Sequence, residues 1–229
     1  MTRQNTWSGK PSSGTSTRPS WLSNVARSLA RYVRCCTEAG VAYRVLEGIG
    51  TPYVQILMEA QRYDVIVLGH HTHFQFGSEA EPDVTLSKVL AASPRPVVAM
   101  PDKLRDGEAV LIAYDGSLQA ARALAAFESS GLGQGRPVHV VSVADSKKEA
   151  ERCSKRAVEF LRLHRVEAEA CPVESVQSPV EVILDSIEMV DAGLLVMGAY
   201  GQPVLRDFFL GSVTRGLLEK CHVPMFLFH

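Results

Sequence analysis

The stretch SPVEVILDSIEMVDAGLLVMG, residues 178–198, sets the fold class of this 229-residue chain. It opens with Ser178 and Pro179, a hydroxyl residue and a proline at the positions where helices commonly begin. An amphipathic helical pattern follows, and the apolar run 194–197 then predicts a buried strand that ends at Gly198. A helix that leads directly into a short buried strand is typical of proteins built from βαβ units.

A similar stretch occurs about 128 residues earlier in the chain. Residues 51–69, TPYVQILMEAQRYDVIVLG, share the hydroxyl-proline start, an Ile-Leu pair in the helical part and the final glycine. The segments that follow also match, since LSKVLAASPRPVVAM (86–100) parallels TRGLLEKCHVPMFLF (214–228). We therefore interpret the chain as two copies of one domain.

The second copy is the more complete one. Its pattern predicts strands at 109–114, 137–143, 166–173, 193–197 and 223–228, with helices at 118–129, 147–164, 179–190 and 212–221. Ser117 is the expected cap of the first of these helices. The alternation predicts an α/β fold with an open, mostly parallel, five-stranded sheet flanked by helices.

The first copy lacks its beginning. A helix is expected at 22–39 and a strand at 41–47, and these correspond to the second helix and third strand of the other copy. The expected domains are a disordered tail at 1–20, a partial degenerate repeat at 21–104 and a complete domain at 105–229.

Composition excludes several classes of protein. The net charge is −1, so no basic surplus points to nucleic acid, and no charge block suggests an electrostatic membrane anchor. No apolar run approaches the length of a transmembrane helix. The five cysteines form no C-x-x-C pair, which favours a reduced, cytoplasmic setting. We therefore expect neither a nucleic-acid partner nor a membrane partner.

Three glycines and two hydroxyl residues follow the strand that ends the opening stretch. They fit the pattern G-x2-G-x9-G-[S/T]: Gly198, Gly201, Gly211, Ser212 and, two residues on, Thr214. Glycine lets the backbone approach a ligand closely, and a helix that begins near Gly211 would present free N–H groups to a phosphate. The pattern is neither a Walker A loop, because no lysine follows, nor the dinucleotide fingerprint G-x-G-x-x-G.

This pattern resembles that of the universal stress protein family. Three further features add to the likeness: Asp115-Gly-Ser after the first strand, Val143 at the end of the second and the closing strand after Pro224. The likeness covers 109–229, with a degenerate partial copy over about 22–102. The chain is similar to a tandem universal stress protein with a truncated first repeat. The resemblance implies a nucleotide-binding fold of the adenine nucleotide alpha hydrolase type.

The resemblance also implies a ligand, which would be ATP or another adenine nucleotide, with Mg²⁺ as an optional companion. Asp115 and the backbone of Val143 would meet the adenine, and Ala113 and Met197 would flank the base or ribose. The ribose and phosphates would be held by Gly198, Gly201, Gly211, Ser212, Val213 and Thr214. In the first copy Asp83-Val84 stands in place of Gly211-Ser212 after an acidic stretch, so we expect no nucleotide there.

Simpler interpretations stay open at several of these positions. The glycines could be ordinary loop residues, and Asp115 could only cap the next helix. His70, His71 and His73 could bind a metal, although a polar surface loop without metal is favoured. No catalytic constellation is evident, so no catalytic residue and no enzyme are expected, with weak ATP hydrolysis left open.

The function expected from the sequence is that of an ATP-binding stress-response protein that acts through nucleotide-dependent conformation or association. The alternatives are a nucleotide-independent interaction scaffold and a slow ATPase. The last strands of the two copies, Val97–Met100 and Met225–Phe228, are expected to pair inside one chain as a pseudo-dimer. The missing strands would leave an open sheet edge, which could support a homodimer.

Overall fold

The computed structural model describes residues 20–46, 48–70, 84–199 and 211–229, with side chains from Arg27 onward. The chain divides into two compact units, Met1–Gly48 and Ile49–His229, and each is considered by itself. The expected tail at 1–20 lies almost wholly outside the described residues, so its predicted disorder stays a prediction.

The first unit contains one helix, α1 (Ser20–Glu38), within its described residues. Gly40 lies two residues beyond the end of the helix, and its φ of +65° is the left-handed conformation that glycine adopts freely. The predicted strand at 41–47 is wrong over its described residues 41–46, which form no ladder. A strand needs a neighbouring strand for its backbone hydrogen bonds, and this unit offers none among the residues described.

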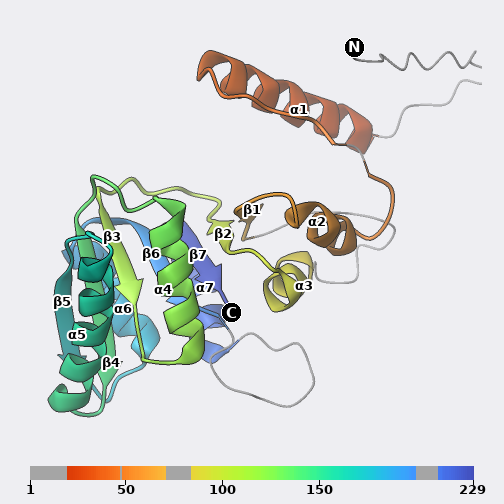
Figure 1. Cartoon of the computed structure of the whole chain (residues 1–229). Coiled ribbons are helices and arrows are strands. Elements are labelled where there is room, and N and C mark those ends of the chain that lie inside the picture. Colours follow the sequence, from red (N-terminus) through yellow and green to blue (C-terminus); the bar gives the residue numbers. More distant parts are fainter. Residues whose placement is uncertain (1–19, 47, 71–83, 200–210) are drawn as a thin grey trace, which may run out of the picture. The chain divides into compact units, whose positions relative to one another are not determined.

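The second unit alternates helices and strands along the chain (Figure 1). Its helices are α2 (Pro52–Ala60), α3 (Thr85–Ala92), α4 (Leu118–Ser130), α5 (Lys147–Leu163), α6 (Pro179–Met189) and α7 (Ser212–Lys220). Its strands are β1 (Ile66–Gly69), β2 (Val97–Met100), β3 (Ala109–Ala113), β4 (Val138–Ala144), β5 (Glu169–Glu174), β6 (Ala192–Gly198) and β7 (Met225–Phe228). Apart from 41–46, the predicted elements are confirmed with shifts of up to three residues at their ends.

All seven strands form one sheet in the order β1-β2-β7-β6-β3-β4-β5. The five strands of residues 109–228 are parallel, as predicted. The sheet continues beyond β7 because β2 pairs with it antiparallel, with Val98 opposite Phe226. The expected contact between Val97–Met100 and Met225–Phe228 inside one chain is therefore confirmed.

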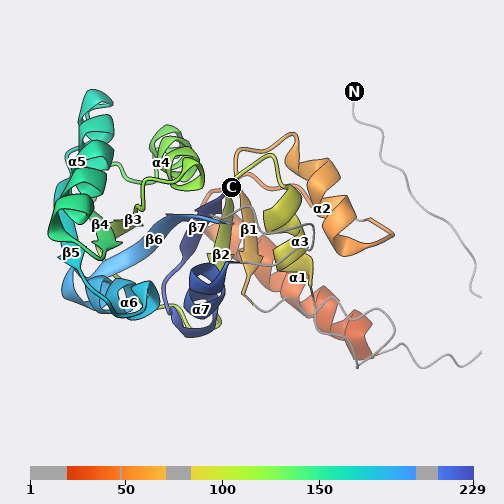
Figure 2. The ribbon, with the colours of Figure 1, turned by 90° about the horizontal axis from the view of Figure 1, so that it is seen from below.

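Helices cover both faces of the sheet (Figure 2). On one face, α4 and α5 enclose a core that includes Phe127, Leu161 and Phe226, each 0–1% exposed. On the other face, a second core joins α6 and α7 to α2 and α3, with Leu217 and Val89 both fully buried. The helices and strands of 51–100 therefore share a continuous core with the rest of the unit.

The connection from β2 to β3 is held by polar contacts and close backbone packing. Arg105 pairs with Glu188 and donates to the Asp191 carboxylate at 3.3 Å, and its backbone N–H donates to the His222 carbonyl at 2.9 Å. An ideal Cβ on Gly193 would lie only 2.1 Å from the Gly107 carbonyl oxygen. The lack of a side chain at Gly193 thus lets this connection lie directly against the start of β6.

One face of β1 carries no helix among the described elements. Val67 in β1 and Val196 in β6 both stand two residues before a strand-ending glycine, Gly69 and Gly198. Val196 is covered by α4 and is 0% exposed, whereas Val67 is 61% exposed. The same position therefore makes a core contact in one half of the sheet and an apolar surface in the other.

Alanine substitutions at these two valines form a matched pair. Val196→Ala should lower the free energy of unfolding by about 2–3 kcal/mol, because it removes two buried methyl groups and leaves a cavity. Val67→Ala should change it by less than about 0.5 kcal/mol, because the side chain is mostly in water. Urea denaturation of both variants measures the difference, and equal losses would mean that the face over β1 is covered in solution.

Candidate functional site

The candidate site lies where the carboxyl ends of β3 and β6 meet. These neighbouring strands are parallel, and Ala113 is in register with Met197. From β3 the chain continues to β4, which lies on one side of β3 in the sheet. The later strand β6 lies on the other side of β3. Such a reversal of strand order opens a crevice in parallel sheets, and ligands of α/β proteins bind there.

A tight turn after β3 carries Asp115. The Ser117 N–H donates to Asp115 Oδ1 at 2.9 Å, and Gly116 between them has a φ of +79°. Ser117 Oγ in turn accepts the Ala120 N–H at 3.1 Å, so the predicted helix cap at Ser117 is confirmed. Asp115 stabilises the turn rather than capping the helix, and its exposed carboxylate keeps further lone pairs for a ligand.

The ends of β3 and β4 are tied together beside this turn. Ser142 is 2% exposed and donates its hydroxyl to the Tyr114 carbonyl at 2.6 Å, and the Tyr114 N–H donates to the Val141 carbonyl at 2.9 Å. These bonds hold Val143 next to the turn, half-buried at the rim of the crevice. Ser142 is not among the predicted site residues; it is a buried hydroxyl residue within a mostly apolar strand.

Cys153 of α5 lies beneath the turn and was also missed. Its Sγ is 3.7 Å from the Asp115 carbonyl oxygen, and an ideal Cβ on Gly116 would lie 3.2 Å from the same sulfur. Burial first, and then the neighbouring Glu149 carboxylate, raise the pKa of the Cys153 thiol. The thiol is therefore neutral at physiological pH and serves as packing under the Asp115 turn.

Gly198, at the end of β6, has a reason in packing alone. An ideal Cβ there would lie 2.5 Å from the backbone nitrogen of Ala120, far inside van der Waals contact. The glycine allows the first turn of α4 to lie directly against the end of β6. Gly198 therefore shapes the crevice, and no ligand is needed to account for it.

At Gly211, in contrast to Gly198, packing among the described residues does not require a glycine. Gly211 is the N-cap of α7, it makes no side-chain cap, and apart from its chain neighbours no heavy atom of the described residues lies within 4 Å of an ideal Cβ on it. The first turn of α7 contains no acidic residue, and Ser212 is exposed. Open space before an uncapped helix start suits an anion, because the free N–H groups and the helix dipole both attract negative charge.

The remaining predicted site residues differ in how accessible they are. Ala113 and Val213 are half-buried, whereas Met197 and Thr214 are only 7% and 3% exposed. Gly201 lies outside the described residues, so its predicted role is neither supported nor opposed. Met197 can offer little more than an edge to a ligand, and Thr214 packs into the second core layer.

The corresponding region of the first half is built differently. Helix α3 has Val84 as its N-cap, with the side chain 44% exposed, where α7 has a glycine. His70 lies at the end of β1, and its backbone N–H donates to the Met100 carbonyl at 2.7 Å. His71 and His73 lie outside the described residues, and so does the acidic stretch that ends at Asp83.

The fold and these contacts define an α/β protein whose parallel strands reverse their order at β3 and β6. The profile of the universal stress protein family matches residues 108–229, slightly more than half of the chain. The chain belongs to the universal stress protein family.

The chain is also similar to individual proteins and solved structures. The universal stress protein Slr1230 of Synechocystis is 25% identical over 166 residues, which are 72% of this chain and 58% of that protein. The chain thus spans less than two thirds of this relative's length. A universal stress protein from Archaeoglobus fulgidus has the same fold, with a TM-score of 0.65 at 22% identity over 91% of this chain and 77% of its own. Another structure from Archaeoglobus fulgidus, a complex with dAMP, matches 53% of this chain and 97% of its own at 24% identity, with a TM-score of 0.44.

The two glycines should respond differently to the same substitution. Gly198→Ala should destabilise the protein by about 1–3 kcal/mol, because the new Cβ forces β6 and α4 apart. Gly211→Ala should change the unfolding free energy by less than about 0.5 kcal/mol, since the space there is open. Thermal and urea unfolding would decide, and a Gly211→Ala variant as unstable as Gly198→Ala would show that the start of α7 is packed.

Proposed function

We propose that this chain binds one adenine nucleotide, such as ATP, in the crevice between β3, β6 and α7, and that binding changes its conformation or association in a stress response. The observation that carries the proposal is the start of α7. A Cβ on Gly211 would meet no described atom beyond its chain neighbours, and α7 begins there without a side-chain cap or an acidic residue in its first turn. The family likeness supports the choice of an adenine nucleotide over other anions.

The proposed roles follow from what each group can do. The N–H groups at the start of α7 and the Ser212 hydroxyl would receive phosphate oxygens, with Gly201 in the preceding loop. The Asp115 carboxylate would accept from the adenine amino group or a ribose hydroxyl, and Val143 would offer backbone groups at the rim. Ala113, Met197 and Gly198 would form the floor, with Val213 and Thr214 behind the phosphates.

The proposed site offers binding groups but no catalytic machinery in its described part. Asp115 and Ser212 provide the oxygen donors that Mg²⁺ prefers, so a nucleotide could enter with its magnesium ion. The nearest other carboxylate in the contacts of this turn is that of Glu149, which lies 3.7 Å from Cys153 Sγ and pairs with Arg152 at the surface. We therefore propose a binding protein, with slow hydrolysis as a secondary activity at most.

We further propose that residues 21–104 are a partial repeat of the domain at 105–229, and that the β2–β7 pairing is an internal pseudo-dimer contact. The order helix-strand-helix-strand of α2, β1, α3 and β2 repeats that of α6, β6, α7 and β7, and the two halves meet antiparallel. The first half would bind no nucleotide, because it has a valine cap at α3. The five cysteines are all free, which fits a reducing, cytoplasmic setting.

One observation favours a second candidate, a nucleotide-independent interaction scaffold. The free edge of β1 and the exposed Val67 offer a surface for another strand or helix, and a homodimer could form there. This surface would act without any ligand. Nucleotide affinity separates the two candidates.

Calorimetric titration with ATP tests the proposal. We expect about one nucleotide per chain, and an affinity at least about tenfold weaker, or some 1.4 kcal/mol, in Gly211→Glu, which places bulk and negative charge at the proposed phosphate position. Gly211→Ala is the matched control and should bind almost as well as the parent chain. If folded parent protein takes up no nucleotide, the scaffold becomes the better account.

A further inference from the structure

The two sides of α1 differ in chemistry. Arg27, Arg31 and Arg34 follow one another at spacings of four and three residues and share one side of the helix. A second set with the same spacing, Leu29, Val33 and Cys36, shares the opposite side. The helix therefore combines a basic stripe with an apolar stripe.

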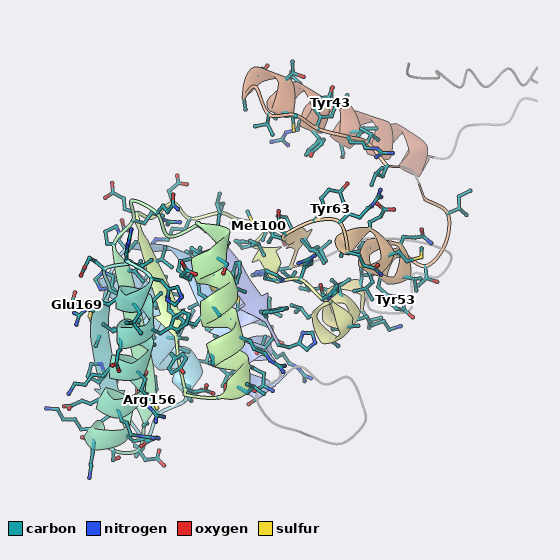
Figure 3. The ribbon with its side chains drawn as sticks, viewed as in Figure 1. Tyr43, Tyr53, Tyr63, Met100, Arg156 and Glu169 are labelled. Carbon is teal, nitrogen blue, oxygen red and sulfur yellow. The ribbon has the colours of Figure 1, made fainter. Side chains whose placement is uncertain are left out.

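The apolar stripe is only partly covered in the first unit, where Leu29 is exposed and Val33 and Cys36 are half-buried. Leu29 is 37% exposed, and Tyr32 beside it is 54% exposed, although its ring meets Tyr43 edge-to-face with the centroids 6.3 Å apart. Figure 3 shows Tyr43 on the segment that runs alongside α1. In α5, by contrast, Ala157 and Leu161 on the apolar side are both 0% exposed. Helix α5 uses its apolar side to cover a sheet, and α1 does not within its own unit.

The charge around α1 is of one sign. Residues 1–37 contain no Asp or Glu, and their basic residues are Arg3, Lys10, Arg18, Arg27, Arg31 and Arg34. The first acidic residue, Glu38, lies 3.9 Å from Arg34, and both side chains are 69% exposed. An ion pair so exposed is weak, so the positive stripe stays available to an anionic surface.

We propose that α1 binds the surface of membranes that contain anionic lipids. The helix lies in the plane of the interface, with Leu29, Val33 and Cys36 at the acyl boundary and the arginines at the headgroup phosphates. No described helix is long and apolar enough to cross a membrane. Nucleic acid would satisfy the arginines but would leave the apolar stripe in water, so a lipid surface fits both sides of α1 better.

Cosedimentation of the full chain with vesicles tests this inference. One set of vesicles contains phosphatidylcholine with about 30% phosphatidylserine, and the other contains phosphatidylcholine alone. We expect at least about tenfold tighter binding to the anionic vesicles, and a loss of binding as salt rises above about 0.1 M. We expect vesicle binding without added ATP. A chain that binds no nucleotide would therefore contradict the proposed function but not the membrane inference, and a chain that binds no vesicles would contradict only the membrane inference.

Two pairs of variants separate the contributions of charge and apolar surface. R27Q/R31Q should weaken binding roughly 30-fold, whereas K147Q/K148Q, which removes the same charge from exposed positions at the start of α5, should change it less than about twofold. L29Q/V33Q should weaken binding by about tenfold or more. Its control, L163Q/V176Q, removes apolar side chains that are 79% and 95% exposed in the second unit, and it should bind normally.

Several results would overturn the inference. They are no binding to the anionic vesicles, equal binding to both kinds of vesicle, or equal losses in the α1 variants and their controls. Self-association of the chain through α1, seen as a doubled mass that L29Q/V33Q abolishes while vesicles stay unbound, would assign the stripe to a second copy instead. Salt-sensitive binding to duplex DNA without vesicle binding would assign the arginines to nucleic acid.

Discussion

The antiparallel pairing of β2 with β7 is the contact on which the second unit depends. It joins a two-stranded block, β1–β2, to the five-stranded block β7-β6-β3-β4-β5 and makes one sheet of them. A four-residue strand pair is a weak structure on its own. Here Val97, Ala99, Met225 and Phe226 are each 0–1% exposed, so the pairing is stabilised by helices packed on the sheet. Without it, β1 and β2 would have too little surface to bury.

The same contact closes one edge of the five-stranded block. Since β7 is already paired on both sides, with β6 and β2, its edge is closed. The free edges of the described sheet are β1 and β5. In the strand order, β2 and β7 stand between β1 and the proposed site at β6 and β3, so a ligand there and a partner at the free edge of β1 would not compete. The strands β1 and β2 extend the sheet beyond β7.

The glycines show how a motif can mix two physical requirements. Gly198 is fixed by backbone packing against Ala120, whereas Gly211 lies in open space before α7. From the sequence spacing alone, both glycines are predicted to belong to the ligand site. The coordinates distinguish them, because a Cβ is impossible at one position and harmless at the other. The proposed phosphate position therefore rests on Gly211 and the free start of α7 rather than on the whole glycine pattern.

Much of the fold could be predicted from the sequence, because helical and strand periodicities are strong between 109 and 228 and are repeated in part between 51 and 100. The conformation of 41–46 could not be predicted. Val41, Tyr43 and Val45 alternate as in a strand, but no described strand of their unit lies beside them to pair with. For the site, the Asp115 turn and the Ser117 cap followed from turn chemistry. The buried supports Ser142 and Cys153 did not, because their role depends on contacts between distant elements.

The expectation of no membrane partner depends on the lack of a block of like charges and of an apolar run of transmembrane length. The net charge of the chain hides the separation of charges along it, since the first 37 residues contain only basic ones. The sequence predicts a helix at 22–39 that corresponds to the second helix of the other copy, which is α5. Only the structure shows Leu29 and Tyr32 exposed in their own unit.

The most direct test of the central claim, one nucleotide crevice in the second half, is an NMR titration of the backbone amides with ATP. The amides of Ser212 and Val213 at the start of α7 should shift strongly, and those of Thr85 and Leu86 at the start of α3 should stay in place. This pattern would place the nucleotide at α7 alone. Shifts of equal size at both helices, or none at Ser212 and Val213 at saturating ATP, would contradict the account.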